Sequence, residues 1–261
     1  MSSRLTDRGI AHRAASRRSS PAFDWYAPGT WPTALEGVNA VYATFIPDLA
    51  VPGAPEIIGA FVKAAKAAGV RRVVLLSERR EPGAAACEAL LRESSLEWTI
   101  LQASWFMENF SEGGFVEGIE AGLLSVPVHG TREPFVDLDD LADVAVAALL
   151  EDRHVGQTYE VTGPELLSFD DAVGRIAQAV GRPVRFEPCS AAEFQDTLVA
   201  GGVEANDANF VAGLVESILD GRNENLGDGV ERALGRAPAG FDAFVERAVN
   251  ANVWTLGEEK R

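Results

Sequence analysis

Residues 72–102 read RVVLLSERREPGAAACEALLRESSLEWTILQ. This stretch opens with a nearly continuous apolar run at 72–77, passes through an alanine-rich segment with helical spacing at 84–93, and closes with a second apolar run at 97–102. Apolar strands that alternate with helices are typical of a parallel sheet covered on both faces. The stretch therefore predicts a strand, a helix and a strand of a doubly wound, Rossmann-like α/β fold.

The same alternation continues on both sides of this stretch. Toward the N-terminus we expect a strand at 39–45 and helices at 31–35 and 54–68; toward the C-terminus we expect helices at 139–150 and 169–180, strands at 158–161 and 184–186, and a mostly helical end at 191–253. Ser168 is a good N-cap for the helix at 169–180. Residues 110–130 form a glycine-rich irregular region, and 257–261 a frayed tail. We predict a dinucleotide-binding domain at 1–157 and a smaller substrate-side lobe at 158–261.

The beginning of the chain departs from a complete fold of this kind. Residues 4–9 predict the tail of a helix that ends at Gly9, and 10–15 predict a short strand. A dinucleotide site also needs a first strand and a glycine-rich turn at a helix N-terminus, which cradles the pyrophosphate. Neither is visible, so we expect an N-terminally truncated sheet without the first strand of the order 3-2-1-4-5-6. The consequence would be weak or absent NADP binding.

Charge and composition exclude several classes of protein. The 261 residues carry a net charge of −16 with 47% hydrophobic content, which argues for a soluble globular protein and against nucleic-acid or membrane binding. Residues 1–18 hold five arginines and one aspartate, a charge of +4, which leaves −20 on the rest. Two cysteines, Cys87 and Cys189, indicate a reducing, cytoplasmic setting. We expect a monomer or homodimer that acts on a small molecule.

The usual catalytic groups are scarce. The sequence has three histidines and no tyrosine with a lysine four residues later, and it has no Gly-x-Ser-x-Gly elbow. We interpret His129 as a loop histidine. The acidic set Asp137, Asp139 and Asp140 precedes a helix, where carboxylates stabilise the positive end, and this reading is preferred over a cation site. The sequence therefore predicts neither a catalytic residue nor a metal.

Two features suggest a ligand site beyond the carboxyl ends of the strands, where open parallel sheets bind ligands. Arg17 and Arg18 follow the predicted strand at 10–15, and their guanidinium groups suit the 2′-phosphate of NADP; the alternative is a solvated basic loop. Trp105 and Phe110 follow the strand at 97–102, where they serve core packing or wall an apolar substrate pocket.

At this point the sequence resembles the NmrA-like, atypical short-chain dehydrogenase/reductase family, which includes NAD(P)H-dependent quinone and azo reductases and ergot-alkaloid-type reductases. The matching stretches span most of the chain in the family's order: 12–17, 36–41, 71–77, 97–110, 133–137, 140–145 and 159–165. Two departures are the missing glycine-rich segment and Gln102-Ala103, where the family usually has Arg-Pro.

The resemblance implies roles for individual residues. Arg17 would grip the 2′-phosphate with support from Arg18, and the remaining cofactor residues would be Asp24 and Trp25 by the adenine, Thr44, Phe45 and Pro47 along the middle, and Ser77, Ala103, Ser104 and Trp105 by the nicotinamide. The substrate would lie beside Glu78, Phe106, Asn109 and Phe110.

These observations lead to one function and two alternatives. We expect an NAD(P)H-dependent oxidoreductase that passes hydride from NADPH to a small, apolar, electron-poor acceptor such as a quinone, enone or imine. Such acceptors need little proton delivery from the protein. A non-catalytic, NAD(P)-sensing regulatory protein and an inactive truncated remnant are the alternatives.

Overall fold

The structure is a computed structural model that describes residues 1–128 and 130–254. His129 and the predicted tail at 257–261 lie outside the described residues. The chain divides into two compact units of three segments each: unit 1 comprises 1–103, 139–161 and 227–237, and unit 2 comprises 104–138, 162–226 and 238–261. This division differs from the expected boundary after residue 157, because the chain passes between the units several times. In the described part of the chain, no helix is long and apolar enough to cross a membrane.

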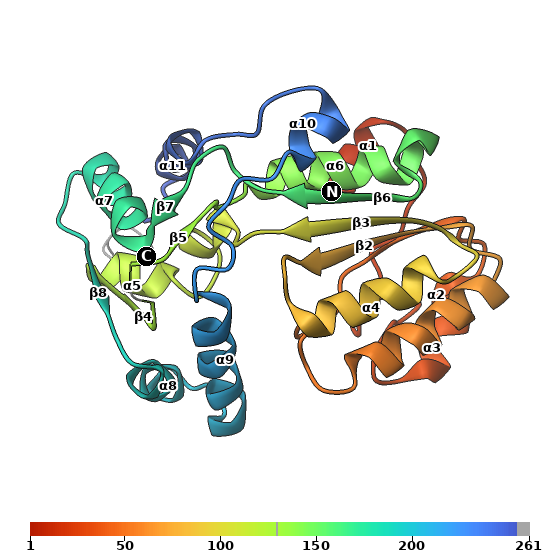
Figure 1. The fold of residues 1–261 in the computed structure, drawn as a ribbon, viewed down its shortest axis with the longest axis horizontal. Coiled ribbons are helices and arrows are strands. Elements are labelled where there is room, and N and C mark those ends of the chain that lie inside the picture. Colours follow the sequence, from red (N-terminus) through yellow and green to blue (C-terminus); the bar gives the residue numbers. More distant parts are fainter. Residues whose placement is uncertain (129, 255–261) are drawn as a thin grey trace. The chain divides into compact units, whose positions relative to one another are not determined.

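Unit 1 contains the predicted parallel sheet. Its strands are β1 (Ala40–Ala43), β2 (Arg72–Glu78), β3 (Glu97–Ala103) and β6 (Gln157–Val161), in the order β1-β2-β3-β6 and all parallel. Helices α3 (Ala54–Ala67) and α4 (Pro82–Arg92) lie on one face of the sheet, and α6 (Leu138–Leu150) lies on the other (Figure 1). Helix α10 (Gly229–Leu234) contacts β6. The doubly wound α/β class is therefore confirmed.

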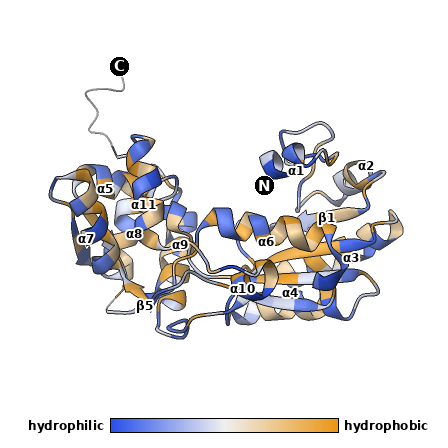
Figure 2. Ribbon diagram, turned by 90° about the horizontal axis from the view of Figure 1, so that it is seen from above, coloured by the Kyte–Doolittle hydropathy of each residue, from blue (hydrophilic) through white to orange (hydrophobic). Residues whose placement is uncertain are grey.

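Burial on both faces explains the continuous apolar runs. Val73, Leu75 and Ile100 belong to the hydrophobic cluster that α3 and α4 complete. Val74 and Leu101 alternate with them along the strands and are fully buried as well. Successive side chains of a strand point to opposite faces, so burial of both faces favours apolar residues at consecutive positions in the middle of these strands. The strand region of unit 1 is correspondingly hydrophobic in Figure 2.

A buried arginine fixes the amino end of this sheet. Arg72 begins β2, and its side chain is only 1% exposed. Its Nη2 lies 2.8 Å from the Glu97 carboxylate at the start of β3 and 2.5 Å from that of Asp152, which follows α6. Its Nη1 donates to the carbonyl oxygen of Leu149 at the end of α6. The buried charge is thus paired and hydrogen-bonded, as burial requires.

The predicted strand at 10–15 is wrong. Helix α1 (Ser2–Asp7) forms, and Gly9 has the expected left-handed backbone with φ 67°. Residues 10–15, however, have no regular structure and are exposed. In the order 3-2-1-4-5-6 such a strand pairs with the first strand, and the described residues supply no partner of that kind, since β2 is the only strand paired with β1. The short helix α2 (Trp31–Leu35) lies where it was predicted.

Unit 2 is built around aromatic side chains. Phe110 is fully buried, and its ring lies within 5.3–6.0 Å of the rings of Phe115, Phe135, Phe169 and Phe241. Around this cluster lie two-stranded sheets β4 (Leu123–Val126) with β8 (Arg185–Pro188) and β5 (Arg132–Glu133) with β7 (Leu167–Ser168), and helices α5 (Val116–Ala121), α7 (Phe169–Val180), α8 (Ala191–Ala200), α9 (Ala205–Ile218) and α11 (Phe241–Asn250). Region 110–130, expected to be irregular, thus contains α5 and β4.

Ser168 caps α7 as predicted. Its hydroxyl accepts from the backbone N–H of Asp171 at 3.0 Å, and the Asp171 carboxylate accepts from the backbone N–H of Ser168 at 3.1 Å. This reciprocal arrangement satisfies two amides at the helix start.

Two glycines of unit 2 should respond oppositely to alanine. A Cβ on Gly163 would overlap the carbonyl oxygen of Phe135, whereas one on Gly174, inside α7, would meet nothing within 4 Å. We expect Gly163→Ala to lower the free energy of unfolding by about 1–3 kcal/mol through overpacking, and Gly174→Ala to raise it by about 0.5–1 kcal/mol through helix propensity. Urea denaturation measures both. Equal effects of the two substitutions would contradict this account of Gly163.

Candidate functional site

The pairing register of unit 1 brings the carboxyl ends of three strands to one edge. Ala43 at the end of β1 pairs with Leu75, and Glu78 at the end of β2 pairs with Ala103 at the end of β3. The polypeptide that follows β1 therefore lies next to the last residues of β2. Ligands of open parallel sheets bind beyond this edge. It is the candidate functional site, and its residues come from unit 1.

The segment that follows residues 10–15 is tied to the end of β1. The indole N–H of Trp25 donates to the carbonyl oxygen of Thr44 at 2.9 Å. The Trp25 ring is 8% exposed and packs at 5.2 Å from Phe45 and 4.9 Å from Phe61, measured between ring centroids. Asp24 accepts from the backbone N–H of Tyr26 through its carboxylate. Trp25 and Phe45 thus anchor this segment, and neither presents its ring freely to solvent.

Arg17 and Arg18 lie on a compact exposed loop of this segment. Ser19 closes the loop, because its hydroxyl accepts from the backbone N–H of Ser16 and donates to the carbonyl oxygens of Ser16 and Pro21. Among the described residues, no partner is found for either guanidinium group. Arg4 and Arg13 differ, since they bind the Asp143 carboxylate and the Glu36 carbonyl oxygen. The basic start of the chain therefore offers two available cations at Arg17 and Arg18.

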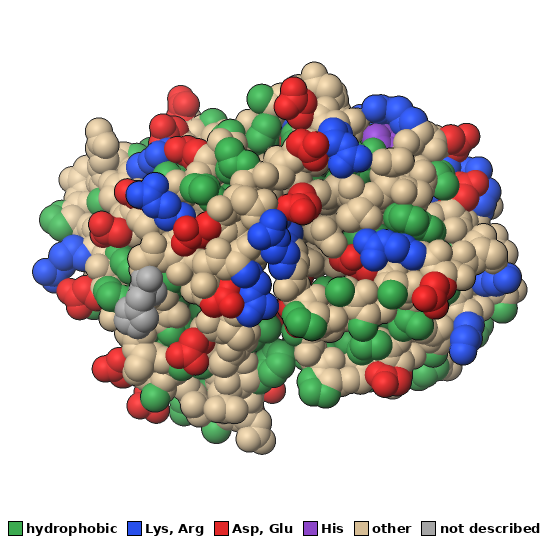
Figure 3. All heavy atoms as spheres, viewed as in Figure 1, with side chains coloured by type: hydrophobic (Ala, Val, Ile, Leu, Met, Phe, Trp, Pro, Cys, Tyr) green, Lys and Arg blue, Asp and Glu red, His purple; other side chains and the backbone are tan. Residues whose placement is uncertain are grey.

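Large apolar side chains lie exposed near the same end of β1. Ile46 is 63% exposed directly after Phe45, and Tyr26 is 60% exposed with its ring 6.2 Å from that of Phe45. Pro47 follows, also exposed. On the face shown in Figure 3, acidic, basic and apolar side chains are interspersed. Arg17, Arg18 and Tyr26 thus belong to the segment that Trp25 ties to the end of β1, and Ile46 belongs to that strand end.

Two half-buried carboxyl groups, Asp48 and Glu78, lie near each other beyond the ends of β1 and β2. Burial, followed by the nearby Asp48 charge, raises the pKa of Glu78 to about 8. Burial also raises the pKa of Asp48, whose carboxylate accepts from the Ala50 backbone N–H at 2.7 Å. Burial and a neighbouring carboxylate both disfavour a negative charge on Glu78, so its protonated form is stabilised.

Helix α4 holds this pair in place. The carboxylate of Glu81 caps the helix by accepting from the backbone N–H of Ala84. Gly83 approaches the turn after β1 closely, since a Cβ there would lie 2.8 Å from the Leu49 carbonyl oxygen. The same helix carries Cys87, whose thiol pKa is raised to about 12 by burial and by nearby carboxylates.

Ser77 does not present a free hydroxyl to the site. It donates to the buried carboxylate of Glu88 on α4 at 2.6 Å, and the side-chain amide of Gln102 donates to both Glu88 oxygens. Arg92 supplies the positive charge at 2.8 Å. Gln102 thus satisfies Glu88 with a neutral amide, and Arg92 on the same helix balances the charge.

The remaining predicted residues, apart from Ala103, lie in unit 2, where Ser104 and Phe110 are buried and Trp105 is half-buried. Ser104 donates to the carbonyl oxygen of Pro134 at 2.6 Å, and the Trp105 ring stacks on Phe115 at 5.9 Å. Phe106 bridges to Val136, both Phe106 and Asn109 are half-buried, and Phe110 is in the aromatic core. Ala103 remains in unit 1 as the last residue of β3.

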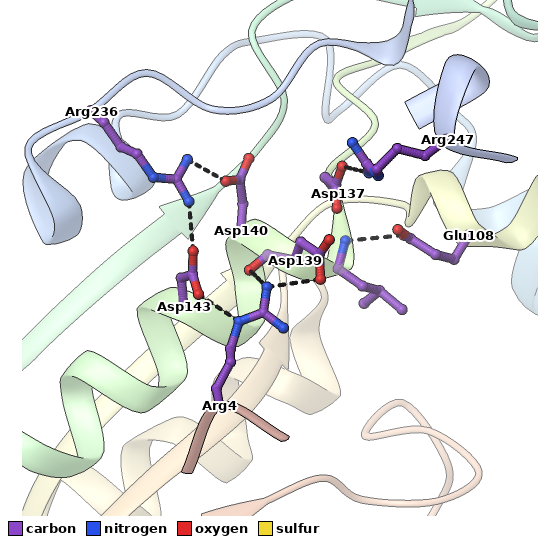
Figure 4. A network of polar contacts seen from close by, with 9 residues as sticks. Arg4, Glu108, Asp137, Asp139, Asp140, Asp143, Arg236 and Arg247 are labelled. Carbon is purple, nitrogen blue, oxygen red and sulfur yellow. Dashed lines mark hydrogen bonds and ion pairs between the residues drawn. The ribbon is translucent and has the colours of Figure 1, made fainter. Parts of the chain in front are cut away.

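The acidic set at the start of α6, with Asp137 before the helix and Asp139 and Asp140 in its first turn, is bound by arginines. In unit 1, Arg4 pairs with Asp139, and Arg236 pairs with Asp140 (Figure 4). In unit 2, Arg247 pairs with Asp137. No group of three or more potential metal ligands occurs among the described residues. Asp139 and Asp140 thus lie at the start of the helix, each paired with an arginine.

Glu108 is a second carboxyl group with a raised pKa, in unit 2. It accepts from the backbone N–H of Leu138 at 3.0 Å (Figure 4). Burial raises its pKa to about 7, with a contribution from the carboxylate of Asp137. Its hydrogen bond to the start of α6 indicates a structural role.

Sequence reasoning identified Glu78 at this edge but missed the side chains that surround it, namely Asp48, Glu81 and Glu88, and it also missed Tyr26 and Ile46. Asp48 lies shortly after the predicted strand at 39–45, and this position at a strand end could have identified it as a candidate site residue. Nothing in the sequence pairs Glu88 with Gln102.

Comparison with known proteins places the chain in a family. It is 33% identical to an uncharacterized oxidoreductase of Bacillus subtilis, YesF, over 98% of this chain and 92% of the relative. It is 30% identical to an NAD(P)H azoreductase of Xenophilus azovorans, over 78% of this chain and 69% of the relative. No family model matches. The chain belongs to the NmrA-like, atypical short-chain dehydrogenase/reductase family.

A solved structure supports the fold. The triphenylmethane reductase of Citrobacter sp., in its complex with NADP(H), matches with a TM-score of 0.74 at 21% sequence identity, covering 95% of this chain and 86% of that chain. At this level of identity the match shows the Rossmann-like fold alone.

The carboxyl pair predicts an unusual dependence of stability on pH. Glu78 has a pKa of about 8 when folded and an ordinary, lower pKa when unfolded, so the unfolded chain releases its proton first. Stability should therefore fall as pH rises from the unfolded to the folded pKa. Glu78→Gln, which stays neutral, should raise the melting temperature more at about pH 9 than at about pH 5.

The control is Glu56→Gln, an exposed carboxylate on α3. It should shift the melting temperature equally at both pH values. The same equal shift for Glu78→Gln would show that Glu78 is ionised across this range and would refute its raised pKa.

Proposed function

We propose that the protein is an oxidoreductase that uses NADPH in preference to NADH and passes hydride to a small, apolar, electron-poor acceptor such as a quinone, enone or imine. The observation that carries the proposal is the exposed pair Arg17 and Arg18, without partners among the described residues, on a segment that Trp25 ties to the carboxyl end of β1. Family membership supports it, and the relative from Xenophilus azovorans is named for the use of NAD(P)H.

The residues present fit the adenosine end of NADP. Two guanidinium groups match a phosphate dianion bidentately. Tyr26 and Ile46 offer exposed apolar surface on the same segment and on the strand end to which it is tied. The pyrophosphate is less well served, because the described residues contain no glycine-rich turn between a strand and a helix. We therefore expect weak cofactor binding. Activity assays will need a high NADPH concentration for this reason.

When bound, the cofactor supplies the hydride. The chain would contribute Arg17 and Arg18 to hold the 2′-phosphate and the edge formed by the ends of β1 and β2 to orient the two reactants. Holding donor and acceptor in a reactive geometry is itself a large part of catalysis. The sequence offers no tyrosine–lysine relay, which favours acceptors with a low demand for protonation.

The test of activity is direct. The purified chain, mixed with NADPH and a panel of quinones, enones and imines, should oxidise the cofactor at a rate that depends on the acceptor, followed by the loss of absorbance of NADPH. Calorimetric binding of NADPH without turnover of any acceptor would instead favour a non-catalytic, NAD(P)-sensing protein. A low-micromolar dissociation constant would contradict the expected weak binding.

The arginine pair can be tested separately. Arg17→Ala should raise the KM for NADPH by about ten-fold to a hundred-fold, the equivalent of one or two charged hydrogen bonds, and leave the KM for NADH unchanged. Arg18→Ala should have a smaller effect of the same kind. The control is Arg8→Ala in the same basic stretch, which should change neither constant. An equal rise of the KM for NADPH and for NADH in Arg17→Ala would show that Arg17 does not bind the 2′-phosphate.

A further inference from the structure

We propose that His154, Tyr159 and Arg232 form an acid-sensitive latch in unit 1: the neutral imidazole of His154 holds Tyr159 in the position that docks helix α10, and protonation of the imidazole releases this helix. The inference is independent of the proposed oxidoreductase activity. It concerns a buried histidine that lies outside the candidate functional site.

His154 is fully enclosed near the amino ends of β3 and β6. It is the last residue of the short 3-10 turn Asp152–His154 that follows α6, and its side chain has no exposed surface. Its backbone carbonyl oxygen accepts from the hydroxyl of Thr99 on β3 at 2.7 Å. The turn is thus fastened to the sheet, and the imidazole has a fixed position.

The imidazole is hydrogen-bonded through one nitrogen. Its Nδ1 lies 2.8 Å from the hydroxyl of Tyr159, whose side chain is also buried. Burial raises the pKa of the Tyr159 hydroxyl, so this group keeps its proton and donates it to Nδ1. Nε2 is buried without a hydrogen-bond partner in the part of the chain that the structure describes. An exception of this kind among buried polar atoms calls for a functional explanation.

Tyr159 connects the imidazole to α10, which lies against β6 (Figure 1). The guanidinium carbon of Arg232 on α10 lies 5.0 Å from the centroid of the Tyr159 ring, a cation–π contact. The same guanidinium donates to the carbonyl oxygen of Thr158 at 3.4 Å and to the side-chain oxygen of Gln157 at 3.1 Å. Arg232 therefore fastens α10 to β6. The helix belongs to segment 227–237, a part of unit 1 that is preceded and followed by stretches of unit 2.

Protonation changes both contacts of Tyr159. It makes both nitrogens of the imidazole donors, so the Tyr159 hydroxyl loses the acceptor of its own proton. A buried O–H group without an acceptor is unfavourable. A positive charge also arises beside the ring that attracts Arg232, and two positive charges repel each other strongly where water is excluded. Both effects weaken the docking of α10.

The charges on the turn and on β2 favour the neutral imidazole. Burial lowers the pKa of His154, and the positive charges of Arg153 and Arg72 lower it as well. The Glu151 carboxylate opposes this effect, but it lies 3.8 Å from Nε2, beyond hydrogen-bond distance, and it pairs with Arg153 at 2.7 Å. Asp152 pairs with Arg72. The carboxylates near His154 are therefore already bound by arginines.

The direction of the pH dependence follows from these contacts. The unfolded chain takes up a proton on His154 near pH 6.5, the ordinary pKa of about 6.5 for histidine. The folded protein takes it up only at lower pH, because burial lowers the pKa. The stabilisation is therefore complete above about pH 6.5 and is lost as the pH falls toward the folded pKa. Within that interval, one pH unit changes the opening equilibrium by at most about ten-fold.

Amide hydrogen exchange measures the docking of α10 directly. Between about pH 6.5 and pH 5.5, we expect the protection factors of residues 229–234 to fall by about two-fold to ten-fold in the wild-type protein. His154→Gln, which takes up no proton, should keep them constant over this range. The matched control is His12→Gln, which replaces an exposed histidine and should behave like the wild type.

Tyr159→Phe tests the connection between the imidazole and the helix. It retains the ring beneath Arg232 and removes the hydroxyl that binds Nδ1. We expect the fall in protection to be no more than half of that in the wild-type protein. A fall of full size in Tyr159→Phe would overturn the route through the hydroxyl. Constant protection in the wild type, or a fall that persists in His154→Gln, would overturn the latch itself.

A measurement on the wild-type protein keeps the proposal testable if His154→Gln does not fold. Proton NMR of the histidine rings should show one group that titrates below pH 6.5, with the same midpoint as the loss of protection in residues 229–234. An ordinary pKa for all three histidines of the sequence would contradict the proposal. None of these measurements requires cofactor or turnover, so their outcome is separate from that of the activity assays.

Discussion

The buried guanidinium of Arg72 is the interaction on which the sheet of unit 1 depends. It joins the starts of β2 and β3 to the end of α6, so it fixes the two strand starts relative to each other and to this helix. Removing one partner of such a buried ion pair typically costs about 3–5 kcal/mol, because the other charge is left buried and unpaired. In parallel strands of similar length, fixing the starts also fixes the ends. The register that places Glu78 beside Ala103 therefore follows from a contact at the opposite edge.

The two edges of the sheet thus differ in their electrostatics. At the amino edge, Arg72 is matched by Glu97 and Asp152, and the charges are satisfied. At the carboxyl edge, Asp48, Glu78 and Glu81 gather three carboxyl groups, and the arginine nearest in the chain is turned toward Glu160. Proteins tolerate such an uncompensated arrangement mainly where it serves function, since perturbed carboxyl groups concentrate at active sites.

The sequence supported the prediction of the alternating strands and helices, because residues such as Val73 and Val74 are apolar on both faces and admit no other placement. The strand predicted at residues 10–15 does not form, although its composition is strand-like. A strand is stabilised by backbone hydrogen bonds to a neighbouring strand, and these residues have no such neighbour in the described part of the chain. The prediction also failed at α5 and β4, where glycines obscured short elements that are stabilised by Phe110 and its neighbours. The strand ends located Glu78, but the proximity of Asp48 arises from a turn whose path no local pattern encodes.

The environment of Cys87 has a practical consequence. A thiol with a pKa of about 12, fully buried on the inner face of α4, is almost never a thiolate and cannot be reached by a reagent in the folded state. The half-buried Cys189, in unit 2, is the only other sulfhydryl group in the sequence. A maleimide dye should therefore attach at Cys189 alone in the native protein and at both positions after denaturation. Labelling of the native protein would therefore mark unit 2 without any engineered substitution. The fraction of molecules that carry a second label, at Cys87, would measure how much of the protein has an unfolded unit 1.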